Sequence, residues 1–338
     1  MQSLAVKYRP KDFNEVVFQQ SVIKILTNQI QTNQLRNAYL FAGSSGCGKT
    51  TLARIFANRL NNTENTYIEI DAASNSGVDN VRAIISSAKE RALDCKYKVF
   101  IVDEAHMITI QGWNAFLKCI EETPPYTIII FCTTDPQKIP LTILNRVQRF
   151  NINKIPSDLI KERLSYICKR EEFIHYEEAV DYISKISNGG MRDAISTLEK
   201  CACFSKDLSI NNILTVLGEY SYDSLFTLIN ALIDGKEDVV LNTVNDFHVK
   251  GNDLRHFIDI FISFCLDISK YILFKNCDSI KIPVSMEDKI KASINFDNAS
   301  QYYMYIINNL LDLKNMLKND NDMKSTIEII FLKICRML

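Results

Sequence analysis

The first half of the chain alternates short apolar runs with stretches of helical periodicity. Runs at 38–43, 66–71, 97–104 and 127–134 are rich in Ile, Val, Phe and Tyr, and they have the length of β-strands. A helical pattern follows the first run, and another occupies 77–92. Because two parallel strands need a crossover helix to connect them, this alternation predicts a parallel sheet with helices on both faces.

The second half carries no comparable strand signals and is predicted to be helical. Long amphipathic patterns fill 208–338, and Pro156 stands where a helix can begin. We therefore predict an α/β domain over 1–150, followed by two all-α domains over 151–207 and 208–338.

Composition narrows the class of protein only a little. The 338 residues are 47% hydrophobic and 23% charged, which is typical of a globular chain with two or three domains. No apolar run has the length of a membrane span, and the N-terminal stretch lacks the apolar core of a secretory signal. We expect a cytoplasmic protein with no membrane partner. The formal net charge of −1 gives no nucleic-acid signal, so DNA binding would need locally concentrated charge or backbone amides.

The ten cysteines show no metal-binding or disulfide pattern. They extend from Cys47 to Cys335, and the closest pair, Cys201 and Cys203, is not a C-x-x-C motif. Most lie in apolar contexts, as Cys132 does. We expect small core residues in a reducing compartment.

A complete phosphate-binding loop follows the first predicted strand. Residues 43–50, GSSGCGKT, fit the pattern G-x-x-x-x-G-K-[ST] between a strand and a helix. The glycines allow backbone N–H groups to converge on phosphate oxygens at the positive end of the helix. Lys49 would contact the β- and γ-phosphates, and the Thr50 hydroxyl would bind Mg²⁺. The predicted ligands are ATP and Mg²⁺, and the predicted loop contacts are Gly43, Ser45, Gly46, Cys47, Gly48, Lys49, Thr50 and Thr51.

Polar residues follow the next two apolar strands. Asp103 ends the run VFIVDE, where it would complete the Mg²⁺ site with Thr50, and Glu104 is the candidate base or orienter of the attacking water. Thr133 and Thr134 end the run TIIIFCTT and could face the γ-phosphate or the attacking water. The alternative for these threonines is that they simply end the strand.

A series of motifs in chain order resembles one family. Besides the phosphate loop and VDEAHMIT, the motifs are KYRPKDFNEVVFQQ (7–20), IEIDAASNSGVDNVR (68–82), FLKCIEETPP (116–125), TTDPQKIPLTILNRVQRF (133–150) and GGMRDAISTLEK (189–200). They resemble the bacterial DNA polymerase III gamma/tau clamp-loader subunits and, less closely, the small subunits of replication factor C.

The resemblance implies an AAA+ P-loop ATPase domain, then an all-α lid and an all-α collar that holds a ring of about five subunits, of one or several kinds. It implies that such a subunit loads a sliding clamp onto primer-template DNA during DNA replication.

The resemblance also implies roles for single residues. Arg192 matches the lid arginine that senses nucleotide in its own site, Arg146 matches the arginine finger that acts on a neighbour's γ-phosphate, and Thr134 matches sensor 1. A guanidinium fork suits phosphate oxygens, although each arginine could instead form an ordinary salt bridge. The stretch that lines the adenine pocket in the family matches Tyr8, Arg9, Pro10 and Val17.

DNA contacts are implied less completely. Arg82, Thr109 and Gln111 fall in the stretches that follow the DNA backbone in the family, but Asn75 and Gly77 stand where relatives often carry Arg and Lys. Helix N-termini can bind phosphates without side-chain charge, so we expect DNA binding in a weaker form. Arg82 could equally be a solvated helix residue.

The chain also departs from the family. The stretch 58–66 replaces a four-cysteine zinc module and has no cysteine or histidine, so we expect no zinc. Asn145 and Val147 flank Arg146 in place of Ser and Cys, and Phe18 replaces a glycine. The chain ends at the collar, which is typical of a short form encoded by a phage or a minimal genome. It would then act at the nucleoid or in a host cytoplasm.

Two other functions remain open. One is an AAA+ branch-migration or helicase motor, which the VDEAH motif suggests, although the remaining helicase motifs are missing. The other is a structural clamp-loader subunit without hydrolysis. Intact Lys49, Thr50, Asp103 and Glu104 favour an active ATPase over the second alternative.

Overall fold

The chain divides into two compact units, each described here by itself. Unit 1 comprises Met1–Lys169 and Ile183–Glu199, and unit 2 comprises Arg170–Tyr182 and Lys200–Leu338. The predicted boundaries after residues 150 and 207 remain predictions. The computed structural model describes residues 2–64, 66–75, 77–92, 95–218, 220–249, 253–277, 279–319 and 322–336.

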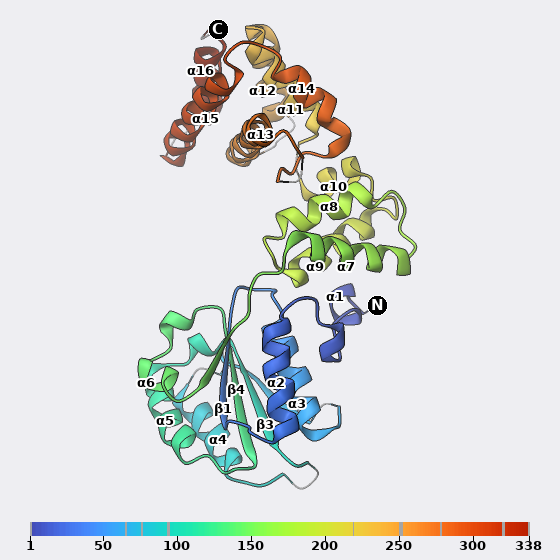
Figure 1. Ribbon diagram of the computed structural model, residues 1–338. Helices are drawn as coiled ribbons and strands as arrows, with labels where there is room; N and C mark the ends of the chain where they lie inside the picture. Colours follow the sequence, from blue (N-terminus) through green and yellow to red (C-terminus); the bar gives the residue numbers. More distant parts are fainter. Residues whose placement is uncertain are drawn as a thin grey trace. The chain divides into compact units, whose positions relative to one another are not determined.

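Unit 1 contains a parallel sheet of five strands in the order β2-β3-β4-β1-β5 (Figure 1). The strands are β1 (Ala38–Ala42), β2 (Tyr67–Asp71), β3 (Lys98–Asp103), β4 (Thr127–Thr133) and β5 (Gln148–Asn151). The first four confirm the predicted runs. We did not predict β5, because only Phe150 of its four residues is buried and the short segment carries no apolar run.

Helices cover both faces of this sheet, as predicted. Successive side chains of a strand point to opposite faces, so Phe41 of β1 packs in one core layer and Leu40 in the other. Helices α2 (Gln20–Thr32) and α3 (Lys49–Asn61) cover the Phe41 layer. Helices α4 (Val78–Ala88) and α5 (Ile110–Glu121) cover the Leu40 layer, where Trp113 of α5 is almost fully buried (Figure 1).

Further helices belong wholly or partly to unit 1. Helix α7 begins directly after Pro156, whose carbonyl accepts a hydrogen bond from the backbone N–H of Ile160, in agreement with the sequence prediction. Helices α8 and α9 are shared between the two units. The bounds of α7, α8 and α9 and of the shorter helices are α1 (Leu4–Lys7), η1 (Phe13–Glu15), η2 (Ala105–Met107), η3 (Pro136–Lys138), α6 (Leu141–Leu144), α7 (Ser157–Arg170), α8 (Glu177–Ile186) and α9 (Met191–Phe204).

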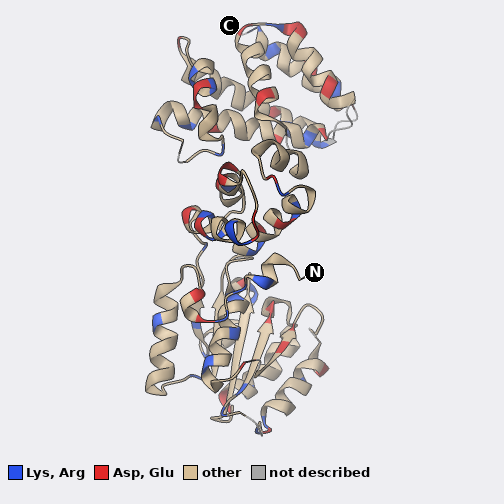
Figure 2. Ribbon diagram, turned by 90° about the vertical axis from the view of Figure 1, so that its right-hand side faces the viewer, with Lys and Arg blue, Asp and Glu red and all other residues tan. Residues whose placement is uncertain are grey.

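The regular elements of unit 2 in the described residues are helices, apart from one isolated β-bridge between Ile174 and Asp207. Its core contains aromatic residues of the long helix α13, among them Phe257 and Phe261, which contact Phe331 of α16. Basic and acidic residues are interspersed along its helices (Figure 2). None of the described helices combines the length and the apolar composition of a membrane span. The helices are α10 (Ile210–Leu217), α11 (Tyr222–Ile233), α12 (Glu237–Val249), α13 (Leu254–Phe274), η4 (Val284–Met286), α14 (Glu287–Ser293), α15 (Ala299–Met316), η5 (Leu317–Asn319) and α16 (Met323–Cys335).

Candidate nucleotide-binding site

Three neighbouring strands bring the predicted site residues to one edge of the sheet. Strand β4 lies between β1 and β3, and all three run parallel. The glycine loop follows β1, Thr134 follows β4, and Asp103 ends β3. Because parallel strands end at the same edge, these groups lie together at the position where open α/β sheets bind ligands.

The glycines of the loop serve different purposes. Gly46 and Gly48 have φ values of 70° and 103°, in the left-handed region that favours glycine, and α3 begins immediately afterwards. Gly43 instead allows close packing, because a Cβ there would lie 2.2 Å from the backbone oxygen of Ile152. Gly43 therefore shapes the loop from behind rather than lining the pocket.

Lys49 is buried inside the loop. Only 6% of the residue is exposed, and its ammonium group donates a hydrogen bond of 2.9 Å to the backbone oxygen of Ser44. The Cys47 thiol donates to the same oxygen, and burial raises the pKa of that thiol. The Ser44 hydroxyl oxygen is buried and has no hydrogen-bond partner among the described residues. A buried cation with donor capacity to spare fits a phosphate group.

Two predicted magnesium ligands lie in direct contact. The Thr50 hydroxyl donates a hydrogen bond of 2.7 Å to Oδ2 of Asp103, and the backbone N–H of Glu104 donates to Oδ1 at 3.0 Å. Hydroxyl and carboxylate oxygens are the protein ligands that Mg²⁺ prefers. The residues therefore fit a magnesium ion beside a triphosphate.

The carboxylate of Glu104 has two further contacts. Thr134 donates its hydroxyl to Oε2 at 3.2 Å, and Nδ1 of His106 lies 3.3 Å from the same oxygen. The same His106 nitrogen lies 3.3 Å from the Thr133 hydroxyl. Sequence reasoning did not predict a role for His106. Its position inside the VDEAH motif, three residues after Asp103, was the available signal.

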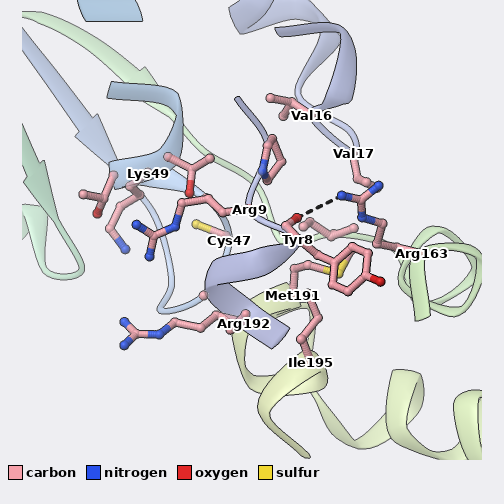
Figure 3. Close-up of a pocket in the computed structure, with 17 residues that line it drawn as sticks. Tyr8, Arg9, Val16, Val17, Cys47, Lys49, Arg163, Met191, Arg192 and Ile195 are labelled. Carbon is pink, nitrogen blue, oxygen red and sulfur yellow. Dashed lines mark hydrogen bonds between the residues drawn. The ribbon is translucent and has the colours of Figure 1, made fainter. Parts of the chain in front are cut away.

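A pocket opens in front of the loop (Figure 3). Most of the predicted nucleotide contacts line it; of the predicted set, Gly43 and Ser45 do not. The predicted residues that line this pocket are Tyr8, Arg9, Pro10, Val17, Gly46, Cys47, Gly48, Lys49, Thr50, Thr51 and Arg192. Their contact with a nucleotide remains a prediction.

The pocket also has lining residues that we did not predict. Arg163 of α7 donates to the backbone oxygen of Tyr8 at 2.9 Å, and its guanidinium lies 5.3 Å from the ring of Tyr166. The Tyr8 and Tyr166 rings are in edge contact, with centroids 6.3 Å apart. The other unpredicted lining residues are apolar: Ala5, Val16, Ile155, Met191 and Ile195.

The motif at the start of α9 packs directly on the glycine loop. The backbone N–H of Arg192 lies 3.5 Å from the Gly46 oxygen. A Cβ at Gly190 would lie 2.8 Å from the Asp193 carboxylate and 3.4 Å from the Ser45 oxygen. This close approach explains the Gly-Gly-Met-Arg-Asp motif and brings Arg192 to the pocket.

Arg146 lies outside this pocket. Its Nε donates to Oε1 of Glu121 at 2.6 Å, and its Nη1 donates to the Thr142 oxygen at 2.8 Å. Its side chain remains 40% exposed. Its role as an arginine finger remains a prediction.

The predicted DNA contacts lie on two helices that pack together. Arg82 on α4 is exposed and lies 3.3 Å from Asp79. Thr109 caps α5 by accepting a hydrogen bond from Gly112 N–H at 3.2 Å, and Gln111 is exposed in the first turn. Their contact with DNA remains a prediction.

The expectation of no zinc also remains a prediction. Within the part of the chain that the structure describes, no three His, Cys, Asp or Glu side chains form a potential metal site.

The fold and site together define an AAA+ P-loop module. Among solved structures, RuvB of Thermotoga maritima (a mutant form) matches with a TM-score of 0.53 at 20% identity, covering 67% of this chain and 80% of that chain. At this identity the likeness concerns the fold alone. It confirms the predicted AAA+ architecture of a parallel sheet with flanking helices.

The chain belongs to the family of DNA polymerase III gamma/tau subunits. It is 35% identical over 324 residues to "DNA polymerase III subunit gamma/tau" of Mycoplasma genitalium, covering 89% of this chain and 53% of the relative. It is 33% identical over 364 residues to "DNA polymerase III subunit tau" of Bacillus subtilis, covering 99% of this chain and 63% of the relative. A family model described as "DNA polymerase III, delta subunit" matches residues 18–75 and 61–156. The chain thus spans about half to two thirds of these two relatives' length.

Proposed function

We propose that this chain is the ATPase motor subunit of a DNA sliding-clamp loader. ATP binding would assemble the ring of subunits and open the clamp, and hydrolysis triggered by primer-template DNA would release the clamp during replication. The ATPase part rests mainly on the 2.7 Å contact between Thr50 and Asp103 beside a complete glycine loop. The clamp-loader part rests on membership of the gamma/tau family.

The chain's own residues would bind the nucleotide as follows. Lys49 and the loop N–H groups hold the β- and γ-phosphates, and Arg192 adds a guanidinium from α9. Tyr8, Pro10 and Val17, which line the pocket, would contact the base. A magnesium ion held by Thr50 and Asp103 would neutralise charge on the phosphate oxygens.

Glu104 would orient and deprotonate the water that attacks the γ-phosphate in line. Two contacts fix its carboxylate: the Thr134 hydroxyl at 3.2 Å and His106 Nδ1 at 3.3 Å. A base already held by neighbouring side chains loses little conformational freedom when it acts.

Residues outside the pocket would serve the assembly. Arg146 would stabilise the transition state in the site of the next subunit, which explains why it lies outside its own pocket. Arg82, Thr109 and Gln111 would meet the DNA backbone from α4 and α5. The required partners are the clamp, primed DNA and the other loader subunits.

An AAA+ branch-migration or helicase motor is the second candidate. The RuvB likeness concerns the fold, whereas the relatives that cover most of the chain carry gamma/tau names. A subunit without hydrolysis is the third candidate, and the Thr50, Asp103 and Glu104 contacts favour an active site instead.

The nucleotide chemistry is tested with two variants and one control. Lys49→Ala should abolish ATP binding, whereas Glu104→Gln should bind ATP and accumulate as an assembled complex that does not hydrolyse it. Glu122→Gln, at an exposed position at the end of α5, is the matched control and should behave as wild type. Turnover by Glu104→Gln at the wild-type rate would show that Glu104 is not the base.

A further inference from the structure

Arg9 and its neighbour Tyr8 extend into different parts of the pocket (Figure 3). Tyr8 lies with Arg163, Met191 and Ile195, whereas the Arg9 guanidinium lies on the side of the Lys49 ammonium. The family motif groups Arg9 with the residues of the base pocket. Its side chain instead points toward the phosphate loop.

The charges around Arg9 are predominantly positive. Burial lowers the pKa of the Arg9 guanidinium most, Arg54 and Arg192 lower it further, and Glu69 and Tyr67 act in the opposite sense. Both oxygens of Glu69 already accept hydrogen bonds from Arg54, at 2.6 and 2.7 Å. The acid that raises the pKa of Arg9 is therefore already paired with Arg54.

Arg9 and Arg192 share a second feature. Neither guanidinium has a hydrogen-bonded or ion-paired carboxylate among the described residues, although both line the pocket. Lys49, on the same side, donates to a backbone carbonyl rather than to an acid. These three cations line one pocket, and like charges there repel one another, so a polyanion would relieve that repulsion.

The two sides of the pocket differ in the ligand groups that they suit. A guanidinium has donors only, in a fork that matches two phosphate oxygens. Apolar side chains, including Val16 and Val17, lie on the Tyr8 side of the pocket (Figure 3). Arg163 on this side donates a hydrogen bond to the Tyr8 backbone oxygen, whereas a guanidinium without such an acceptor would be desolvated there at a cost in free energy.

We infer that Arg9 is a phosphate-binding residue of this site, which acts with Lys49 and Arg192 on the triphosphate and does not contact the base. The inference rests on the proposed function, because it requires that the pocket binds a nucleoside triphosphate. It adds a cation from the N-terminal segment to those of the glycine loop and α9. Adjacent residues, Tyr8 and Arg9, would then bind the two ends of one ligand.

The test separates the phosphates from the base. Calorimetric titrations with ATP, adenosine and inorganic tripolyphosphate are carried out on the full chain and on Arg9→Gln, Arg9→Lys and Arg149→Gln. The last variant removes one positive charge from an exposed position of β5 and is the matched control. Circular dichroism confirms that each variant is folded.

Arg9→Gln should lose about tenfold or more of its affinity for ATP and tripolyphosphate, because a charge-assisted hydrogen bond is removed. Its affinity for adenosine should not change. Arg9→Lys should recover part of the loss, and Arg149→Gln should bind all three ligands as wild type does. Tripolyphosphate affinity of Arg9→Gln within about twofold of wild type would overturn the inference. If wild type and Lys49→Ala bind ATP equally, the proposed function itself is wrong.

Discussion

The ion pair between Arg146 and Glu121 provides a quantitative test of catalysis across a subunit interface. The two side chains are 40% and 50% exposed and approach to 2.6 Å. In the proposed ring, Arg146 must leave Glu121 in order to reach the neighbour's γ-phosphate. The two competing interactions can therefore be compared in free energy.

An exposed ion pair contributes about 0.2–1 kcal/mol. A trans-acting arginine accelerates phosphoryl transfer by about 10³–10⁵, which corresponds to roughly 4–7 kcal/mol. The transition-state stabilisation expected from Arg146 in trans is therefore several kcal/mol larger than the free energy of its ion pair with Glu121. Glu121→Gln should change the rate of the assembled loader by no more than about fivefold, and the direction should be upward. Arg146→Ala should lower the rate by about 10³ or more.

The assay is steady-state ATP hydrolysis by the assembled loader with saturating clamp and primed DNA. Arg146→Ala should bind ATP as the wild-type chain does, because Arg146 lies outside its own pocket. Mixed complexes of Arg146→Ala and Lys49→Ala should regain activity, since some interfaces pair an intact finger with an intact loop. If assembly is confirmed and mixing restores nothing, the trans role of Arg146 is wrong. An equal loss in Glu121→Gln would assign the effect to the ion pair instead.

Four further predictions concern the backbone at Phe18, the hydrogen bonds of Gln19, the DNA surface and zinc. Phe18 has a φ of 70°, so Phe18→Gly should be more stable than Phe18→Ala by about 1 kcal/mol in urea unfolding, and the reverse order would remove the strain argument. Gln19 bonds through its buried amide to both backbone groups of Asn153, at 2.6 and 3.2 Å, so Gln19→Ala should cost about 1–3 kcal/mol while Gln20→Ala, exposed beside it, costs much less. The affinity for primed DNA should depend weakly on salt, and a steep dependence that survives Arg82→Ala would mean that the DNA surface lies elsewhere. Metal analysis should find no stoichiometric zinc, and one zinc per chain would overturn that expectation.

The sequence predicted the parts of this site that depend on short contiguous motifs. The glycine loop and the acids after β3 could be located because strand, turn and helix signals surround them, and four of the five strands followed from apolar runs. Strand β5 could not be predicted because its four residues carry no apolar run. It forms by pairing with β1, which is a contact between distant segments of the chain.

Other residues could not be predicted because their positions depend on contacts between distant segments. Arg163 reaches the Tyr8 carbonyl across 155 positions of the chain, and no local periodicity reports such a contact. His106 lies close to the motif, but its contact with Glu104 depends on the left-handed backbone of Glu104, with a φ of 46°. The direction of the Arg9 side chain likewise depends on the placement of the N-terminal segment beside the glycine loop.

The most direct test of the account is ATP hydrolysis by the assembled loader, measured with and without its clamp and with and without primed DNA. A clamp-loader motor should hydrolyse ATP slowly alone and fastest when clamp and primed DNA are present together, with Glu104→Gln inactive under every condition. Hydrolysis that DNA alone stimulates fully, with no response to the clamp, would contradict the account and favour a branch-migration or helicase motor.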